Sequence, residues 1–146
     1  MKQFVYIVFL LLSLHVSAQT EKNYGIQFYH GTWKEACDKA KAENKLIFVD
    51  FYTQWCGPCL NMAENVFILP FIGDFYNTNF VNLKIDAENG EGVELAKRYG
   101  VNSYPTYVFV DPKNGDVVHR SKSRQEAEQF LATGKSALVP ELRSGY

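Results

Sequence analysis

The chain has 146 residues, of which 47% are hydrophobic, and its formal net charge is -1. This is enough apolar material for the core of one domain of ordinary size. The charge balance shows neither the basic excess of a nucleic-acid-binding protein nor an acidic tail, so nucleic acid is not expected among its partners.

The first 18 residues have the pattern of a secretory signal peptide. Lys2 gives a positive head, residues 4–14 form an apolar stretch, and Val16-Ser17-Ala18 forms a small-residue cleavage site. The alternative is a membrane anchor, but the apolar run is shorter than the ~20 residues needed to span a bilayer. We therefore expect residues 19–146 to form a single exported domain with its core at about 26–134. Its location would be the periplasm in a Gram-negative cell, or otherwise outside the cytoplasm.

Hydrophobic periodicity predicts alternating helices and strands along the rest of the chain. Thr32 and Glu35 have capping-box spacing at the start of the first helix. Ser123 and Glu126 have the same spacing before the last helix, which we expect to end at Gly134. The expected strands are residues 26–28 (at an edge), 46–52, 80–86, 106–110 and 117–121. The expected helices are residues 33–43, a segment beginning at 58 and restarting at 70, residues 92–99 and residues 123–133.

Three isolated cysteine and histidine side chains are not expected to bind a metal or to react. Cys37 lies on the apolar face of the first helix, so a small buried hydrophobe is favoured over a redox or metal role. An unpaired cysteine in an exported protein leaves intermolecular pairing open. His30 and His119 lie in polar surroundings and are predicted to be surface histidines.

The central motif is Trp55-Cys56-Gly57-Pro58-Cys59. Two cysteines three positions apart can face each other across one helical turn, close enough to open and close a disulfide. They follow the apolar run at 46–52, which is typical of a strand buried on both faces. Because Pro58 suits the first turn of a helix, Cys56 is expected at the helix mouth. There the free N–H groups and the helix dipole stabilise a thiolate, which favours a nucleophilic sulfur.

Two other functions for this cysteine pair are weighed. A permanent disulfide is common in exported proteins, but closing a two-residue loop gains little entropically compared with closing a long one. A zinc site can also use this cysteine spacing, but no histidine or further cysteine completes a zinc-binding pattern, so no metal is expected. Redox cycling of Cys56 and Cys59 is the favoured function.

The chain resembles the thioredoxin superfamily in several motifs that occur in the family's order. These are Val49-Asp50-Phe51, the Cys56 motif, Ile85-Asp86, Tyr99-Gly100-Val101 and Tyr104-Pro105-Thr106. The resemblance implies an α/β thioredoxin fold, a central mixed β-sheet flanked by helices on both faces. It also implies that Cys56 attacks, that Cys59 resolves the mixed disulfide, and that no cofactor is needed. Glu64 replaces a proline usual in cytosolic thioredoxins, and the insert up to Phe80 is longer. The chain is therefore more similar to exported thioredoxin-like reductases.

Asp50 lies in a strand too apolar to favour a charge, so burial should raise its pKa. A solvated carboxylate at the strand end is the alternative. The resemblance makes Asp50 the proton acceptor for Cys59. A lysine often partners this carboxylate in the family; the matching position here is Asn82, with Lys84 two residues further on the same strand face.

The resemblance also implies a substrate groove. It would be formed by Trp55, Gly57, Pro58, Tyr104 and Pro105, with a cis bond before Pro105. That bond leaves backbone free to pair with an extended substrate. Core packing is the alternative for Trp55.

These observations predict a monomeric thiol–disulfide oxidoreductase that reduces protein disulfides through Cys56 and Cys59. Its partners would be proteins with disulfides or thiols and an upstream electron donor such as a membrane reductase. Gly57-Pro58 carries no charge that would make the couple strongly oxidising, which favours a reductase. The alternative is a thioredoxin-fold binding module that holds partners without turnover.

Overall fold

The computed structural model describes residues 24–144. The expected signal peptide, residues 1–18, lies outside the described residues. Within residues 24–144, no helix combines the length and the apolar character needed to cross a bilayer.

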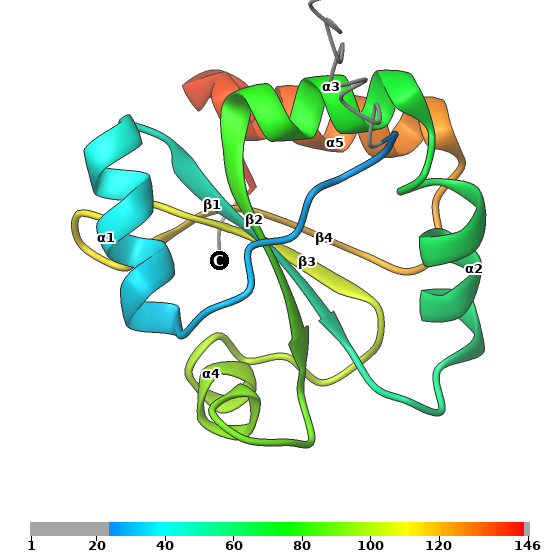
Figure 1. Ribbon diagram of the computed structural model, residues 1–146, viewed down its shortest axis with the longest axis horizontal. Helices are drawn as coiled ribbons and strands as arrows, with labels where there is room; N and C mark the ends of the chain where they lie inside the picture. Colours follow the sequence, from blue (N-terminus) through cyan, green and yellow to red (C-terminus); the bar gives the residue numbers. More distant parts are fainter. Residues whose placement is uncertain (1–23, 145–146) are drawn as a thin grey trace, which may run out of the picture.

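A four-stranded mixed sheet with the order β2-β1-β3-β4 forms the centre of the molecule (Figure 1). Strand β1 (Leu46–Tyr52) pairs in parallel with β2 (Phe80–Asp86) and antiparallel with β3 (Thr106–Val110). Strand β4 (Val117–Lys122) completes the sheet antiparallel to β3. Because β1 has a neighbour on each side and helices over both faces, its five central residues are buried, which explains its continuous apolar run.

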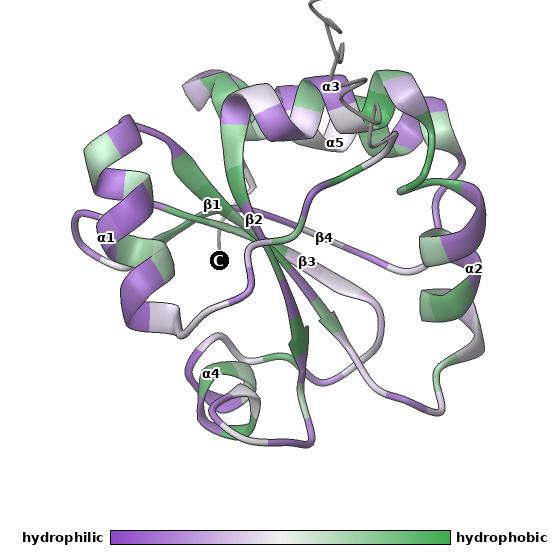
Figure 2. Cartoon of the chain, in the orientation of Figure 1, coloured by the Kyte–Doolittle hydropathy of each residue, from purple (hydrophilic) through white to green (hydrophobic). Residues whose placement is uncertain are grey.

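Helices cover both faces of the sheet, as predicted (Figure 1). Helices α1 (Trp33–Glu43) and α4 (Gly92–Arg98) pack on one face over a largely aliphatic cluster that includes Val49 and Phe51. Helices α2 (Gly57–Asn65), α3 (Pro70–Asn79) and α5 (Ala127–Leu138) pack on the other face over an aromatic cluster. Figure 2 shows β1 as mostly hydrophobic, whereas the edge strand β4 is largely hydrophilic and α1 alternates between hydrophobic and hydrophilic residues.

The first helix, the helix restart and all four sheet strands are confirmed within one residue. Thr32 and Glu35 form the predicted capping box on α1. Helix α2 has Pro58 in its first turn, and α3 restarts at Pro70. Gly100 follows α4 with a positive φ of 62°, a conformation that glycine adopts without steric cost.

The predicted last helix is wrong at both ends. Ser123 adopts a φ of 71°, and its N–H donates to the carbonyl of Pro105, the residue before β3. Ser123 is therefore hydrogen-bonded to the start of β3 and does not cap a helix. Glu126 precedes the helix without a side-chain cap. Gly134 lies buried inside α5, where an added Cβ would come within 2.8 Å of the Phe75 ring. This glycine permits close packing of α5 on α3 rather than ending the helix, and a short 3-10 helix follows at Pro140–Leu142.

Two further expectations are corrected. Residues 26–28 contribute a single parallel bridge between Phe28 and Asn82 rather than a strand. His119 is buried, with 6% of its surface exposed, and its Nδ1 accepts a hydrogen bond from the Ser144 N–H at 3.0 Å. Burial, and next the charge of Arg143, lowers the pKa of His119, so the prediction of a surface histidine is wrong. His30 is exposed as predicted.

Candidate active site

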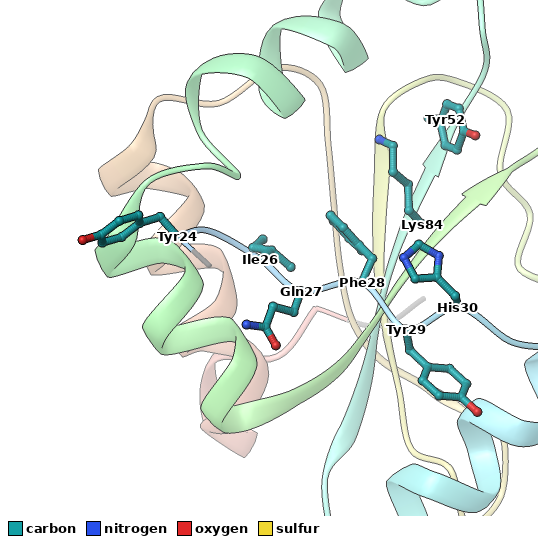
Figure 3. A pocket seen from close by; sticks show the side chains of 8 residues that line it. All are labelled: Tyr24, Ile26, Gln27, Phe28, Tyr29, His30, Tyr52 and Lys84. Atoms are coloured by element: carbon teal, nitrogen blue, oxygen red, sulfur yellow. The ribbon is translucent and has the colours of Figure 1, made fainter. Parts of the chain in front are cut away.

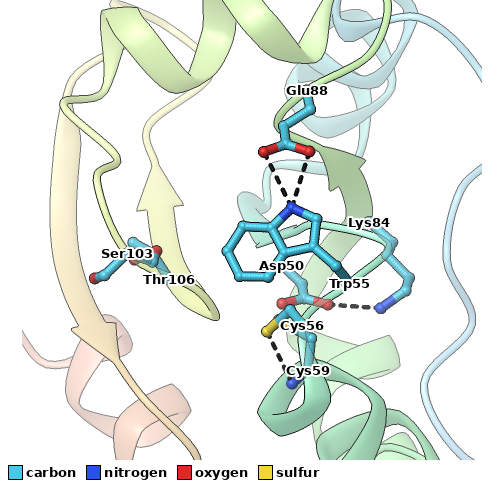
Figure 4. The surroundings of a disulfide bond; sticks show 8 residues. All are labelled: Asp50, Trp55, Cys56, Cys59, Lys84, Glu88, Ser103 and Thr106. Carbon is cyan, nitrogen blue, oxygen red and sulfur yellow. Dashed lines mark hydrogen bonds and ion pairs between the residues drawn. A yellow bond between two sulfur atoms is a disulfide. The ribbon is translucent and has the colours of Figure 1, made fainter.

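The two motif cysteines form a disulfide where β1 leads into α2. Their Cα atoms are 5.3 Å apart, and Cys56 occupies the N-cap position of α2. The backbone N–H of Cys59 donates to the Cys56 Sγ at 3.2 Å (Figure 4). Once the disulfide opens, this N–H and the positive end of the helix dipole favour a thiolate at Cys56.

Asp50 lies on the face of β1 that α2 covers and is 1% exposed, which excludes the solvated alternative. Its Oδ2 accepts from the Lys84 Nζ at 2.9 Å (Figure 4). Burial raises the pKa of the Asp50 carboxyl, and the charge and hydrogen bond of Lys84 offset part of that rise. Asp50 is thus a buried acid with a raised pKa beside the cysteine pair (Figure 4).

Strand register decides which β2 residue partners this acid. Asp50 lies directly opposite Lys84, whereas Asn82 lies opposite Phe48. Lys84 is therefore the partner of Asp50 in this chain, which answers the question that the sequence left open between Asn82 and Lys84. Asn82 instead holds the segment before α1: its carbonyl accepts from the Tyr29 N–H at 2.8 Å.

Aromatic rings surround the Lys84 ammonium, a feature that sequence reasoning missed. Its Nζ lies 4.3 Å from the ring centroid of Tyr52, 5.6 Å from that of Phe67 and 5.9 Å from that of Phe28. Figure 3 shows Lys84 among the residues that line the recess between Tyr52 and the segment 24–30. Such rings attract a cation through their π faces. No local sequence signal brings Phe28 to this place, because the contact depends on its bridge to β2.

Trp55 lies at the rim of the disulfide and is 69% exposed, which excludes core packing. Its indole N–H donates to the Glu88 carboxylate at 3.0 Å (Figure 4). Its ring meets Tyr104 edge-on, with centroids 5.9 Å apart and planes at 86°. The structure thus fixes an exposed aromatic side chain beside the cysteines. The role of Glu88 in holding it was not predicted.

The other predicted groove residues lie around the same disulfide. Gly57 and Pro58 are exposed at the first turn of α2. The Tyr104–Pro105 peptide bond is cis, and Pro105 is buried. A depression beside the sulfurs is lined by Trp55, Gly57 and Leu60 together with neighbouring residues, while Tyr104 reaches the site through its contact with Trp55.

Cys37 lies apart from this site, on the opposite face of the sheet. It is half-buried against the cluster under α1 and α4, and burial raises the pKa of its thiol. Within the described part of the chain, no group of three or more His, Cys, Asp and Glu side chains is arranged to hold a metal ion.

Comparison with known proteins gives the family. Residues 33–138 match the model of the thioredoxin-like domain, and the chain therefore belongs to this family. It is 48% identical to Thioredoxin-1 of Drosophila yakuba over 69 residues, which are 47% of this chain and 60% of that protein. The match thus spans less than two thirds of this curated relative.

Two solved structures show the same fold. The solution structure of a "putative disulphide-isomerase" from Bacteroides thetaiotaomicron has a TM-score of 0.72 and 42% identity, covering 81% of this chain and 97% of that one. A thioredoxin from Thermus thermophilus has a TM-score of 0.70 and 29% identity, covering 79% and 88%. The mixed sheet with helices on both faces is a thioredoxin fold.

The position of Cys56 predicts which thiol reacts first. After reduction, iodoacetamide at neutral pH is expected to label Cys56 about tenfold faster than Cys59, because the start of α2 favours its thiolate. Peptide mapping by mass spectrometry after short exposures measures both rates. The Cys37→Ser variant removes the third thiol and serves as the background. Faster labelling of Cys59 would reverse the assignment.

Proposed function

We propose that this protein is an exported thiol–disulfide oxidoreductase that reduces disulfide bonds of other proteins. The observation that carries the proposal is the Cys56–Cys59 disulfide at the start of α2, beside the buried acid Asp50. Membership of the thioredoxin-like family supports the same chemistry. The signal-peptide pattern of residues 1–18 supports export.

The reaction has two exchanges. The Cys56 thiolate attacks one sulfur of a substrate disulfide, forms a mixed disulfide and releases the other substrate sulfur as a thiolate. Cys59 then gives its proton to the Asp50 carboxylate and attacks the Cys56 Sγ. This step breaks the bond to the substrate and forms the Cys56–Cys59 disulfide, so two electrons pass to the substrate. Trp55, Tyr104 and the backbone before Pro105 would hold the substrate chain beside the sulfurs.

The cycle needs a donor that returns two electrons to the Cys56–Cys59 disulfide. Outside the cytoplasm this donor would be a dithiol protein supplied through the membrane, such as a membrane reductase. We also propose that the chain acts as a monomer.

A binding module that keeps the fold without turnover is the alternative, and insulin separates the two. With dithiothreitol as donor, the protein is expected to accelerate insulin reduction, followed by turbidity. Cys56→Ser should lower the rate to that of dithiothreitol alone, because no nucleophile remains. Cys37→Ser is the matched control and should retain the full rate. A flat trace with retained peptide binding would establish the binding module.

The residues between the cysteines predict the direction of the reaction. Gly57-Pro58 offers no charge to a thiolate, and the nearby Asp50 carboxylate opposes one, so the reduced form lacks the stabilisation of a strong oxidant. Equilibration with glutathione or dithiothreitol buffers should give a potential near that of thioredoxin, about −270 mV. A potential less negative than about −180 mV, the value for protein disulfide isomerase, would contradict a reductase.

Asp50→Asn tests the proton acceptor. Resolution of a preformed mixed disulfide should slow about 10²-fold near neutral pH, because Cys59 loses its base. In the wild type, resolution should fall as the pH drops through the raised pKa of Asp50, and the variant should lack this acidic limb. Single-turnover rates across pH measure both.

The fold of this variant provides the control. A carboxyl whose pKa is raised by folding loses stabilising free energy as the pH rises through that pKa. Asp50→Asn should therefore unfold at or above the wild-type temperature at neutral pH. Identical pH–rate profiles for the wild type and Asp50→Asn would show that Asp50 is not the proton acceptor.

A further inference from the structure

A row of side chains with polar groups crosses the sheet at the level of Asp50. Strand register places Asp50 opposite Lys84 on one side and opposite Tyr107 on the other. Tyr107 also lies opposite Ser121 on β4. Directly opposite residues project from the same face of a sheet, with Cβ atoms about 5 Å apart. Asp50 is thus flanked by a cation on β2 and a phenol on β3.

One oxygen of Asp50 and the hydroxyl of Tyr107 are both buried without a partner among residues 24–144. Lys84 engages the Asp50 Oδ2, whereas the Asp50 Oδ1 and the Tyr107 hydroxyl have no hydrogen bond from the described protein groups. Tyr107 is 0% exposed. Buried polar groups are normally satisfied, directly or through an internal water, because leaving them unpaired is costly.

Packing alone does not account for a tyrosine at this position. The Tyr107 ring contacts the rings of Phe130, Phe48 and Phe67, with centroids 5.1, 6.1 and 6.4 Å away. A phenylalanine would make the same ring contacts and bury no hydroxyl. Tyr76, in the same cluster, differs because its hydroxyl donates to the Phe130 carbonyl at 2.8 Å. The Tyr107 hydroxyl therefore calls for a different partner.

We propose that Tyr107 is a positioning residue for the proton acceptor Asp50, with its phenol donating to the Asp50 Oδ1 directly or through one bridging water. The inference rests on the proposed function, in which Asp50 accepts the Cys59 proton. No direct hydrogen bond joins the two oxygens in the oxidised protein, so a water is the simplest link.

The charges around Asp50 support the donor role of the phenol. Burial, and next the Asp50 charge, raises the pKa of Tyr107 far above its usual value, so this phenol keeps its proton. In the described part of the chain, Lys84 from β2 pairs with Asp50 and Tyr52 lies near it on the same strand. The Cys56–Cys59 pair of α2, which titrates only when reduced, lies beside it (Figure 4).

A hydrogen bond donated by the phenol would lower the pKa of the Asp50 carboxyl. Lys84 stabilises the carboxylate at Oδ2, and a donor at Oδ1 would stabilise it further. Together they would keep enough Asp50 ionised near neutral pH to accept a proton, despite its burial. Without the phenol, the pKa of Asp50 should rise further, and less of the base would be present at a given pH.

Tyr107→Phe tests this inference, with Tyr76→Phe as the matched control from the same aromatic cluster. The carboxyl of Asp50 is followed by carbon-13 NMR in the oxidised protein, with Asp50→Asn to assign its signal. Tyr107→Phe should raise the midpoint by about one pH unit, the size expected for losing a hydrogen bond to a charged group. Tyr76→Phe should leave the midpoint unchanged, because its hydroxyl serves a backbone carbonyl.

Resolution kinetics give the second readout. The acidic limb of the single-turnover profile should move to higher pH by the same amount in Tyr107→Phe. In the Asp50→Asn background the same substitution should have no further effect. An unshifted Asp50 midpoint in Tyr107→Phe would overturn the role of Tyr107, even where Asp50→Asn still slows resolution. If Asp50→Asn leaves resolution unchanged, the proposed role of Asp50 itself fails, and the two failures are thereby distinguished.

A measurement on the unsubstituted protein covers the case in which Tyr107→Phe fails to fold. The ring carbon that bears the Tyr107 hydroxyl should titrate with the same midpoint as the Asp50 carboxyl, because the strength of its hydrogen bond follows the charge of the acceptor. A Tyr107 signal that does not change through that range would overturn the inference.

Discussion

The candidate active site is built around one carboxyl group buried in the central strand. A charge at Asp50, which is 1% exposed, is costly unless it is paired and hydrogen-bonded. Lys84 supplies the pair at 2.9 Å while keeping 29% of its side chain exposed, so only one of the two charges is fully removed from water. The resulting acid has a raised pKa and lies in a rigid sheet, which is the environment that a proton acceptor for a thiol requires.

The same strand places the sulfur chemistry. From Asp50 the chain needs only six residues to reach Cys56 at the start of α2, and α2 packs on the face of the sheet to which Asp50 points. Two opposing fields therefore meet at the disulfide. The start of α2 favours a thiolate at Cys56, whereas the negative charge of the Asp50 carboxylate disfavours one. Their balance, rather than either field alone, decides how readily the pair is reduced.

Local sequence signals predicted the parts of this site whose position depends only on residues nearby in the sequence. The apolar run of β1, Pro58 after Cys56 and the capping box at Thr32 each act within a few residues, and the structure has all three where they were expected. The pairing of Asp50 with Lys84 rather than Asn82 required the register between β1 and β2, which no local signal fixes.

Long-range contacts also explain the failures. Ser123 and Gly134 have the local appearance of helix boundaries, but Ser123 is bound to the Pro105 carbonyl and Gly134 lies against Phe75 and Tyr76. The rings of Phe28 and Phe67 around Lys84 likewise come from segments distant in sequence. The ring of Phe67 approaches both Lys84 and Tyr107, so the aromatic packing on this face also sets the surroundings of the acid. An aliphatic core would bury Asp50 equally well but would offer its lysine partner no π face. The aromatic composition of this face therefore sets the surroundings of Lys84 and, through it, of Asp50.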